Sequence, residues 1–223
     1  MGAAIGQSLP VAVGVLVSPL PIVAVVLMLV SERARSNALA FVAGWFLAVL
    51  ALVLVVALVA GSAAPDDDGP AAWTGWLKIV LGVLLLLLSV RQWRGRPRGA
   101  AEPPAPKWMA AIDQFTPVRS AGLAVLLGAV NPKNLLLVVS GGAAIAATAP
   151  PDTSTTVVAA LVFALVASAG VVTPVVIYFS MGDRAAGILD ELKSWMVRNN
   201  AAIMAVLLLV LGAKMLGDGI STV

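Results

Sequence analysis

Six long apolar runs dominate the sequence and constrain the fold more than any other feature. Polar segments separate these runs, which cover residues 5–30, 38–60, 73–92, 119–148, 155–180 and 200–217. A helix needs about 20 apolar residues to cross a bilayer. Each run suits one crossing, and the 223 residues leave little room for anything beyond short loops. The pattern predicts an all-α integral membrane protein with six transmembrane helices.

The composition excludes most soluble classes of protein. Hydrophobic residues make up 61% of the chain and charged residues 11%, whereas soluble domains hold about 45–50% apolar and about 25% charged residues. The mean hydropathy of +1.02 likewise indicates a chain more apolar than a soluble domain. Cys and His are absent, which excludes disulfides, thiol chemistry and the commonest metal ligand. Because the spans also lack paired carboxylates, we expect no enzyme activity, no catalytic residues, no metal and no cofactor.

The basic residues alternate between the two sides of the predicted membrane. Three loops, 31–37, 91–118 and 181–199, carry nearly all of the Lys and Arg. The N-terminus and the loops 61–72 and 148–155 carry none. Because basic loops stay in the cytoplasm, we expect a multi-pass protein of the plasma (inner) membrane with both termini outside. The same rule explains the net charge of +3 without a nucleic-acid partner.

Two of the apolar runs are interrupted by proline near their middle. The first contains SPLP at 18–21 and the fourth contains NPKN at 131–134. Proline removes a backbone donor, clashes with the preceding turn and moves the residue before it out of α geometry. We therefore expect helices 1 and 4 to be broken. Irregular backbone at membrane depth is tolerated only where protein or a water-filled cavity covers it.

The two breaks occupy corresponding positions in the chain. Each interrupted run opens a set of three spans, and LLLLLSVRQW (84–93) resembles LLLVLGAKML (207–216) near the end of each set. Since three is odd, the second set enters the membrane from the opposite side. We expect two inverted three-helix repeats joined by a basic linker. The expected segments are the first repeat at 1–92, a cytoplasmic linker with an interfacial helix at 93–118, and the second repeat at 119–223.

Paired, Pro-interrupted helices in inverted repeats indicate the midplane site of a transporter. The half-helices that begin at Pro19 and Pro132 would direct their positive ends toward the breaks. Lys133 is the ionisable residue that we place deep in the membrane, where a lysine costs about 3 kcal/mol or more unless it is compensated. Together, the positive helix ends and the lysine would form an electropositive pocket suited to a carboxylate, sulfate or phosphate. The expected substrate-binding residues are Ser18, Pro19, Pro21, Asn131, Pro132, Lys133 and Asn134.

A structural role for Lys133 remains open beside the functional one. The lysine could bind carbonyls freed at the break, or it could cap the preceding half-helix. Two further features concern packing. Ser140, Gly141 and Gly142 permit close helix contact. The stretch 184–198 has one apolar helical face with Trp195; it is either an interfacial helix or an extension that orients the next span, and we favour the extension.

Five segments along the chain carry a resemblance to known proteins. They are SPLPIVAVVLML (18–29), ALAFVAGWFLAV (38–49), PKWMAAIDQFTP (106–117), NPKNLLLV (131–138) and WMVRNNAAIMAVLLLVLGAKML (195–216). In these segments the sequence resembles the LysE-type exporter superfamily, and within it the GAP family of actinobacteria, the glycopeptidolipid-addressing or sulfolipid-1-addressing proteins. The resemblance implies a role in moving envelope glycolipids or their precursors across the plasma membrane. SPLP departs from the Pro-Gly-Pro of amino-acid exporters, which argues against amino-acid substrates.

The leading hypothesis is a transporter that exports an anionic envelope lipid or its precursor through the SPLP and NPKN site. One alternative is a non-transporting accessory subunit of a lipid-export machine, with the basic loop 91–107 as its docking surface. Another is an exporter of small, amino-acid-like molecules. The expected partners are membrane lipids, in particular an anionic glycolipid or phospholipid, together with a lipid-export complex and a second copy in a homodimer.

Overall fold

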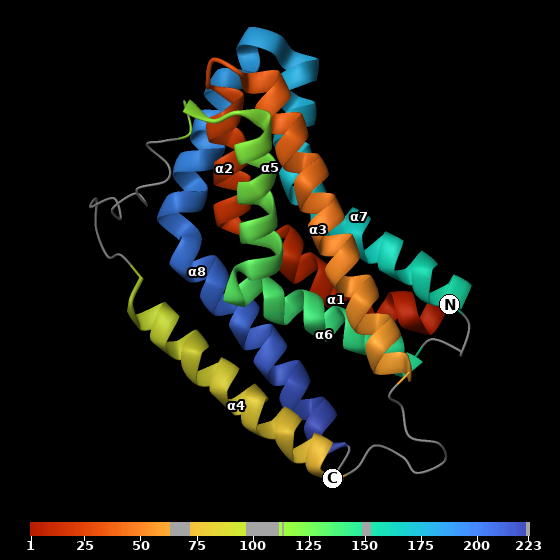
Figure 1. Ribbon diagram of the computed structural model, residues 1–223. Helices are drawn as coiled ribbons and strands as arrows, with labels where there is room; N and C mark the ends of the chain where they lie inside the picture. The colour runs from red at the N-terminus through yellow and green to blue at the C-terminus, as the bar shows by residue number, and fades with distance from the viewer. Residues whose placement is uncertain (63–71, 97–111, 113, 149–152, 222–223) are drawn as a thin grey trace. The chain divides into compact units, whose positions relative to one another are not determined.

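The computed structural model describes residues 1–62, 72–96, 112, 114–148 and 153–221, and within these residues all regular structure is helical. The all-α prediction is confirmed for this part of the chain (Figure 1). The main helices are α1 (Gly2–Leu16), α2 (Pro19–Leu29), α3 (Ala34–Ser62), α4 (Ala72–Arg94), α5 (Pro117–Val125), η2 (Leu126–Val130), α6 (Pro132–Thr148), α7 (Thr153–Met181) and α8 (Ala185–Ile220).

The helix lengths identify a multi-pass membrane protein. The single helices α3, α7 and α8 are each long and apolar enough to cross a bilayer. Two bent pairs also qualify: α1 with α2, bent by 52°, and α5–η2 with α6, bent by 63°. The predicted breaks in the first and fourth spans are therefore confirmed. By length and composition, the described residues hold up to five candidate spans.

Helix α4 covers the remaining predicted run, 73–92, as one helix of 23 residues. Trp76 and Trp93 stand near its two ends and are 58% and 46% exposed. They are about 25 Å apart along the axis, from a rise of 1.5 Å per residue. Aromatic anchors take such positions at the two surfaces of a membrane. This placement supports the assignment of α4 as the sixth span, which stays a prediction.

Each break has the same local cause. Ser18 (φ −78°, ψ 112°) and Asn131 (φ −59°, ψ 120°) have extended backbone, and a proline follows each at the first helical position. Proline forces this conformation on the residue before it and suits the start of the next helix. At the second break the turn also widens, because the amide of Asn131 donates to Leu126 O at 2.8 Å. Such π turns are frequent at functional sites.

The chain divides into two compact units. Unit 1 comprises Met1–Ala63 and Pro104–Ser194, and unit 2 comprises Ala64–Pro103 and Trp195–Val223. Unit 2 takes the third helix of each predicted repeat, so its boundaries differ from those expected for the repeats. The inverted repeat stays a prediction. The interfacial helix expected in the 93–118 linker lies almost wholly outside the described residues.

In unit 1, α3 packs along the whole of the second broken span. A Cβ added to Gly44 would lie 2.9 Å from the carbonyl oxygen of Ala121 in α5. A Cβ added to Gly142 in α6 would lie 2.9 Å from the carbonyl oxygen of Val53. Small residues thus bring α3 against both halves of the broken span. The expected packing role of Gly142 is confirmed.

Helix α7 packs against the first broken span at the break itself. A Cβ on Gly170 would collide with the carbonyl oxygen of Leu16, the last residue of α1. Gly141 likewise leaves room for the ring of Phe163, which confirms its expected packing role. Continuous helices therefore support both interrupted ones, α3 at the second break and α7 at the first.

In unit 2, α4 and the C-terminal part of α8 pack antiparallel through a seam of small residues. Glycine Cβ positions approach the opposite backbone to 2.9 Å at Gly82 with Gly212 O and at Gly219 with Gly75 O. The hydroxyl of Ser89 donates to Ala205 O at 2.6 Å. Each step of seven residues toward the C-terminus of α4 matches a step of seven residues toward the N-terminus of α8. We call this the small-residue seam, and its pairs are Gly75–Gly219, Gly82–Gly212 and Ser89–Ala205.

Helix α8 begins at Ala185 and continues without interruption to Ile220. Within the stretch 184–198, Ala185 and Leu189 are fully buried, while Trp195 is 50% exposed. The stretch is therefore an extension of the following span, as we favoured, and not a separate interfacial helix.

Candidate functional site

The two breaks meet in unit 1. The ammonium of Lys133, in the first turn of α6, donates to Ser18 Oγ at 3.3 Å. Ser18 is the residue immediately before α2 and is 4% exposed. Residues that are 115 positions apart in the sequence thus touch where both spans are interrupted.

The two broken spans run in opposite directions. Helix α1 packs against α6, and α2 packs against η2. The first half of one span therefore lies against the second half of the other (Figure 1). This arrangement is the one that an inverted repeat requires, and it places both interruptions at one level.

The two asparagines of NPKN hold the break in shape. Asn131 Oδ1 accepts a bond from the backbone N–H of Lys133 at 3.1 Å and so caps α6. Asn134 Nδ2 donates to Leu127 O at 2.8 Å, which satisfies a carbonyl freed by the interruption. Asn134 Oδ1 is buried and has no hydrogen-bond partner among the described residues. Asn131 therefore has a structural role, while Asn134 also presents a free acceptor.

The prolines limit how many backbone donors face the site. Pro19 and Pro21 are buried and Pro132 is exposed, and none of the three has an N–H group. In the first three residues of α2 only Leu20 keeps an N–H. In α6 the amide of Lys133 is already bound by Asn131. An anion would therefore depend on the Lys133 ammonium and on the dipoles of α2 and α6 more than on a nest of amides.

No acidic side chain in the described part of the chain balances the charge of Lys133. The two ion pairs recorded among the described residues are Lys193–Asp190 and Lys214–Asp218, so Lys133 has no acidic partner there. An ammonium has three N–H donors, and Ser18 accepts from one. Lys133 donates to no carbonyl in this part of the chain, and Asn134 binds the freed carbonyl instead. Because its contact with Ser18 joins the two breaks, both the structural and the functional role of Lys133 stay predictions.

The structure adds residues that sequence reasoning missed. Trp45 in α3 is fully buried, packs against Gly128 of η2, and has no hydrogen-bond partner for Nε1 among the described residues. Ser168 in α7, two positions before Gly170, is 3% exposed with an unpartnered hydroxyl. One signal was available for Trp45, because tryptophan normally sits at a span's ends and this one is near the middle.

Within the described ranges, no group of three or more His, Cys, Asp or Glu side chains could hold a metal ion. The polar groups at the breaks are an ammonium, two carboxamides and a hydroxyl, which can hydrogen-bond a ligand.

One comparison with known proteins gives a match. The model of the family described as Sap, sulfolipid-1-addressing protein, matches residues 9–221. No curated protein and no solved structure matches the chain. The matched residues include both breaks and parts of both units.

Proposed function

The chain belongs to the sulfolipid-1-addressing protein family, and from this premise we propose that it exports an anionic envelope glycolipid or its precursor across the plasma membrane. The residues proposed to bind the headgroup are Ser18, Lys133 and Asn134, and the prolines and Asn131 shape the two breaks around them.

The contact between Lys133 and Ser18 carries the proposal. It joins the two broken spans, and no acidic side chain in the described part of the chain neutralises the lysine. An ammonium at membrane depth costs about 3 kcal/mol or more. A sulfate or phosphate group would supply the missing counter-charge, and the positive ends of α2 and α6 would add to the attraction.

The neutral groups favour a headgroup that also has hydroxyls. The unpartnered acceptor Asn134 Oδ1 suits an O–H donor, and a sugar supplies several. A glycolipid with a sulfate or phosphate combines both chemistries in one headgroup.

The direction of the helices supports the proposed orientation. Helix α2 ends at Leu29, just before the basic loop 31–37, and α5 begins at Pro117, at the end of the basic loop 91–118. Those two half-helices would face the cytoplasm, while α1 and α6 would face outside. A substrate at the breaks would then have one half of each broken span on either side.

The test is native mass spectrometry of the purified full chain with identification of the lipids that remain bound. The comparison is between wild type, Lys133→Ala and Lys133→Arg, with Lys214→Ala as the control because Lys214 already pairs with Asp218. A specific anionic lipid that wild type, Lys133→Arg and the control retain, and that Lys133→Ala loses, would support the proposal.

Equal retention of bulk lipid by all four proteins would contradict it. In that case the accessory-subunit hypothesis becomes the better one, and partner pull-downs with the 91–107 loop neutralised would follow. Displacement of the bound lipid by a free amino acid would instead favour the exporter of small molecules.

A further inference from the structure

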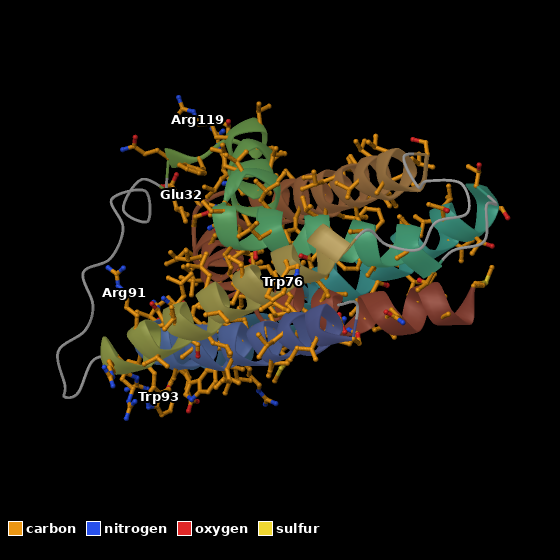
Figure 2. The ribbon with its side chains drawn as sticks, turned by 90° about the horizontal axis from the view of Figure 1, so that it is seen from below. Glu32, Trp76, Arg91, Trp93 and Arg119 are labelled. Carbon is orange, nitrogen blue, oxygen red and sulfur yellow. The ribbon has the colours of Figure 1, made fainter. Side chains whose placement is uncertain are left out.

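One end of unit 2 concentrates arginine and tryptophan. In Figure 2, Arg91 and Trp93 extend from the C-terminal end of α4, away from Trp76 near the opposite end. Trp195 and Arg198 lie in the first turns of the part of α8 that belongs to unit 2. We call this set the arginine end, and it consists of Arg91, Trp93, Arg94, Arg96, Trp195 and Arg198.

The small-residue seam brings these residues to one end of unit 2. The last pair of the seam is Ser89 with Ala205, joined by a hydrogen bond of 2.6 Å. Beyond this pair α4 ends at Arg94, and Arg96 follows two residues later. On α8, Arg198 precedes Ala205 by seven residues, about two turns. Because the helices are antiparallel, the end of α4 and the start of this part of α8 lie at the same level.

No acidic side chain in the described residues of unit 2 compensates the charge at this end. Asp218 is the single acid in the described residues of unit 2, and it pairs with Lys214 at 2.7 Å near the other end of the seam. On α8 the nearest acid, Glu191, precedes Arg198 by two turns, about 10 Å along the axis. Four arginines therefore belong to one end of unit 2, whereas Lys214 near the other end of the seam is paired with Asp218.

One guanidinium is already held in position. Arg96 Cζ lies 3.9 Å from the centroid of the Trp93 ring, and Arg96 Nη1 donates to Trp93 O at 3.0 Å. Stacking on an indole and one hydrogen bond leave the remaining N–H groups of Arg96 available. A planar fork of donors matches two oxygens of a phosphate.

We propose that the arginine end binds the phosphate headgroup of an anionic phospholipid from the surrounding leaflet. Trp93 and Trp195 are 46% and 50% exposed, as expected of side chains at the headgroup level. Leu87 and Val90, one to two turns away on α4, are also exposed and apolar, which suits acyl chains. Basic clusters beside membrane spans bind such lipids. The site shares no residue with the breaks in unit 1.

Loop orientation alone would account for a few basic residues here, but it requires neither an arginine stacked on tryptophan nor exposed apolar side chains beside it. The orientation of the loops in the membrane would be the same with lysine as with arginine. Phosphate binding at the arginine end would differ between the two residues, because an ammonium cannot form the forked pair with phosphate. This difference provides the test.

The experiment measures binding of phosphatidylglycerol and of phosphatidylcholine to the purified full chain by native mass spectrometry. The variants are Arg91, Arg94, Arg96 and Arg198 changed together to Gln, and the same four changed together to Lys. Lys214→Gln is the control at the opposite end. The Lys variant keeps the charge and therefore the orientation in the membrane, and a single engineered cysteine checks that orientation in the Gln variant.

We expect wild type and Lys214→Gln to retain phosphatidylglycerol in preference to phosphatidylcholine. The Gln variant should retain at least about tenfold less, the loss that corresponds to one charge-assisted hydrogen bond, and the Lys variant should fall between. Inorganic phosphate should not displace the lipid. The proposal is overturned if the Gln variant keeps its phosphatidylglycerol, if the two lipids bind equally, or if the Lys variant matches wild type.

Discussion

Lys133 donates its ammonium hydrogen bond to Ser18 Oγ at 3.3 Å. Each residue belongs to a proline interruption, and each interruption is in a different span. This N–H···O distance lies just beyond the usual range of about 2.7–3.2 Å and indicates a weak bond. The pair therefore links the two breaks through one of the three N–H donors of the ammonium.

Replacing Lys133 by Met should separate function from stability. The variant removes an uncompensated ammonium whose burial costs about 3 kcal/mol, so the protein should unfold at the same or a higher temperature. Export of a fluorescent sulfated glycolipid from proteoliposomes should fall by at least about tenfold, the loss of one charged hydrogen bond. Thermal unfolding in detergent and the export assay measure the two effects. A lower unfolding temperature with normal export would show that Lys133 is a structural residue.

Gly170 should tolerate no side chain. Its added Cβ would meet the carbonyl oxygen of Leu16 at the end of α1, and overpacking of this kind typically costs about 1–3 kcal/mol. Gly170→Ala should therefore lower the unfolding temperature measured in detergent. Gly122→Ala is the matched control, because nothing lies within 4 Å of the corresponding Cβ position in α5. Equal unfolding temperatures for the two variants would contradict the close approach of α7 to the break.

The breaks could be predicted from sequence because their cause is local. Proline acts on its own turn and on the residue before it, so SPLP and NPKN identify Ser18 and Asn131 as the interrupted positions without any tertiary information. That Lys133 and Ser18 would share one site was expected from the correspondence of the two breaks, whereas their hydrogen bond was not predicted.

The contacts of Gly170 and Trp45 could not be predicted in the same way. In a soluble helix the apolar stripe indicates the buried face, but a membrane span is apolar all round and its buried face leaves no such pattern. Small residues then decide where two spans approach closely. Because the chain has 20 glycines, the sequence does not show which of them lie at such contacts. The structure alone distinguishes Gly170, which faces a carbonyl, from Gly122, which faces open space.

The small-residue seam predicts a specific cross-link. The chain has no cysteine, so a pair introduced at Ser89 and Ala205 would be the only thiols present. Because Ser89 Oγ lies 2.6 Å from Ala205 O, the double variant should cross-link within one chain on mild oxidation or with a short bifunctional reagent, detected as a mobility shift. The control moves the second cysteine to Val206, which is 52% exposed. More efficient cross-linking of the control would show that the seam has another register.

The orientation can be tested with single cysteines in the same cysteine-free background. Ser36 is exposed in the basic segment before the body of α3, and Thr153 is exposed at the start of α7, beside a loop without basic residues. Because basic segments remain in the cytoplasm, a membrane-impermeant maleimide should label Thr153→Cys in intact cells and should label Ser36→Cys only after permeabilisation. The reverse pattern would invert the proposed topology. It would place α2 and α5 on the outer side of the breaks.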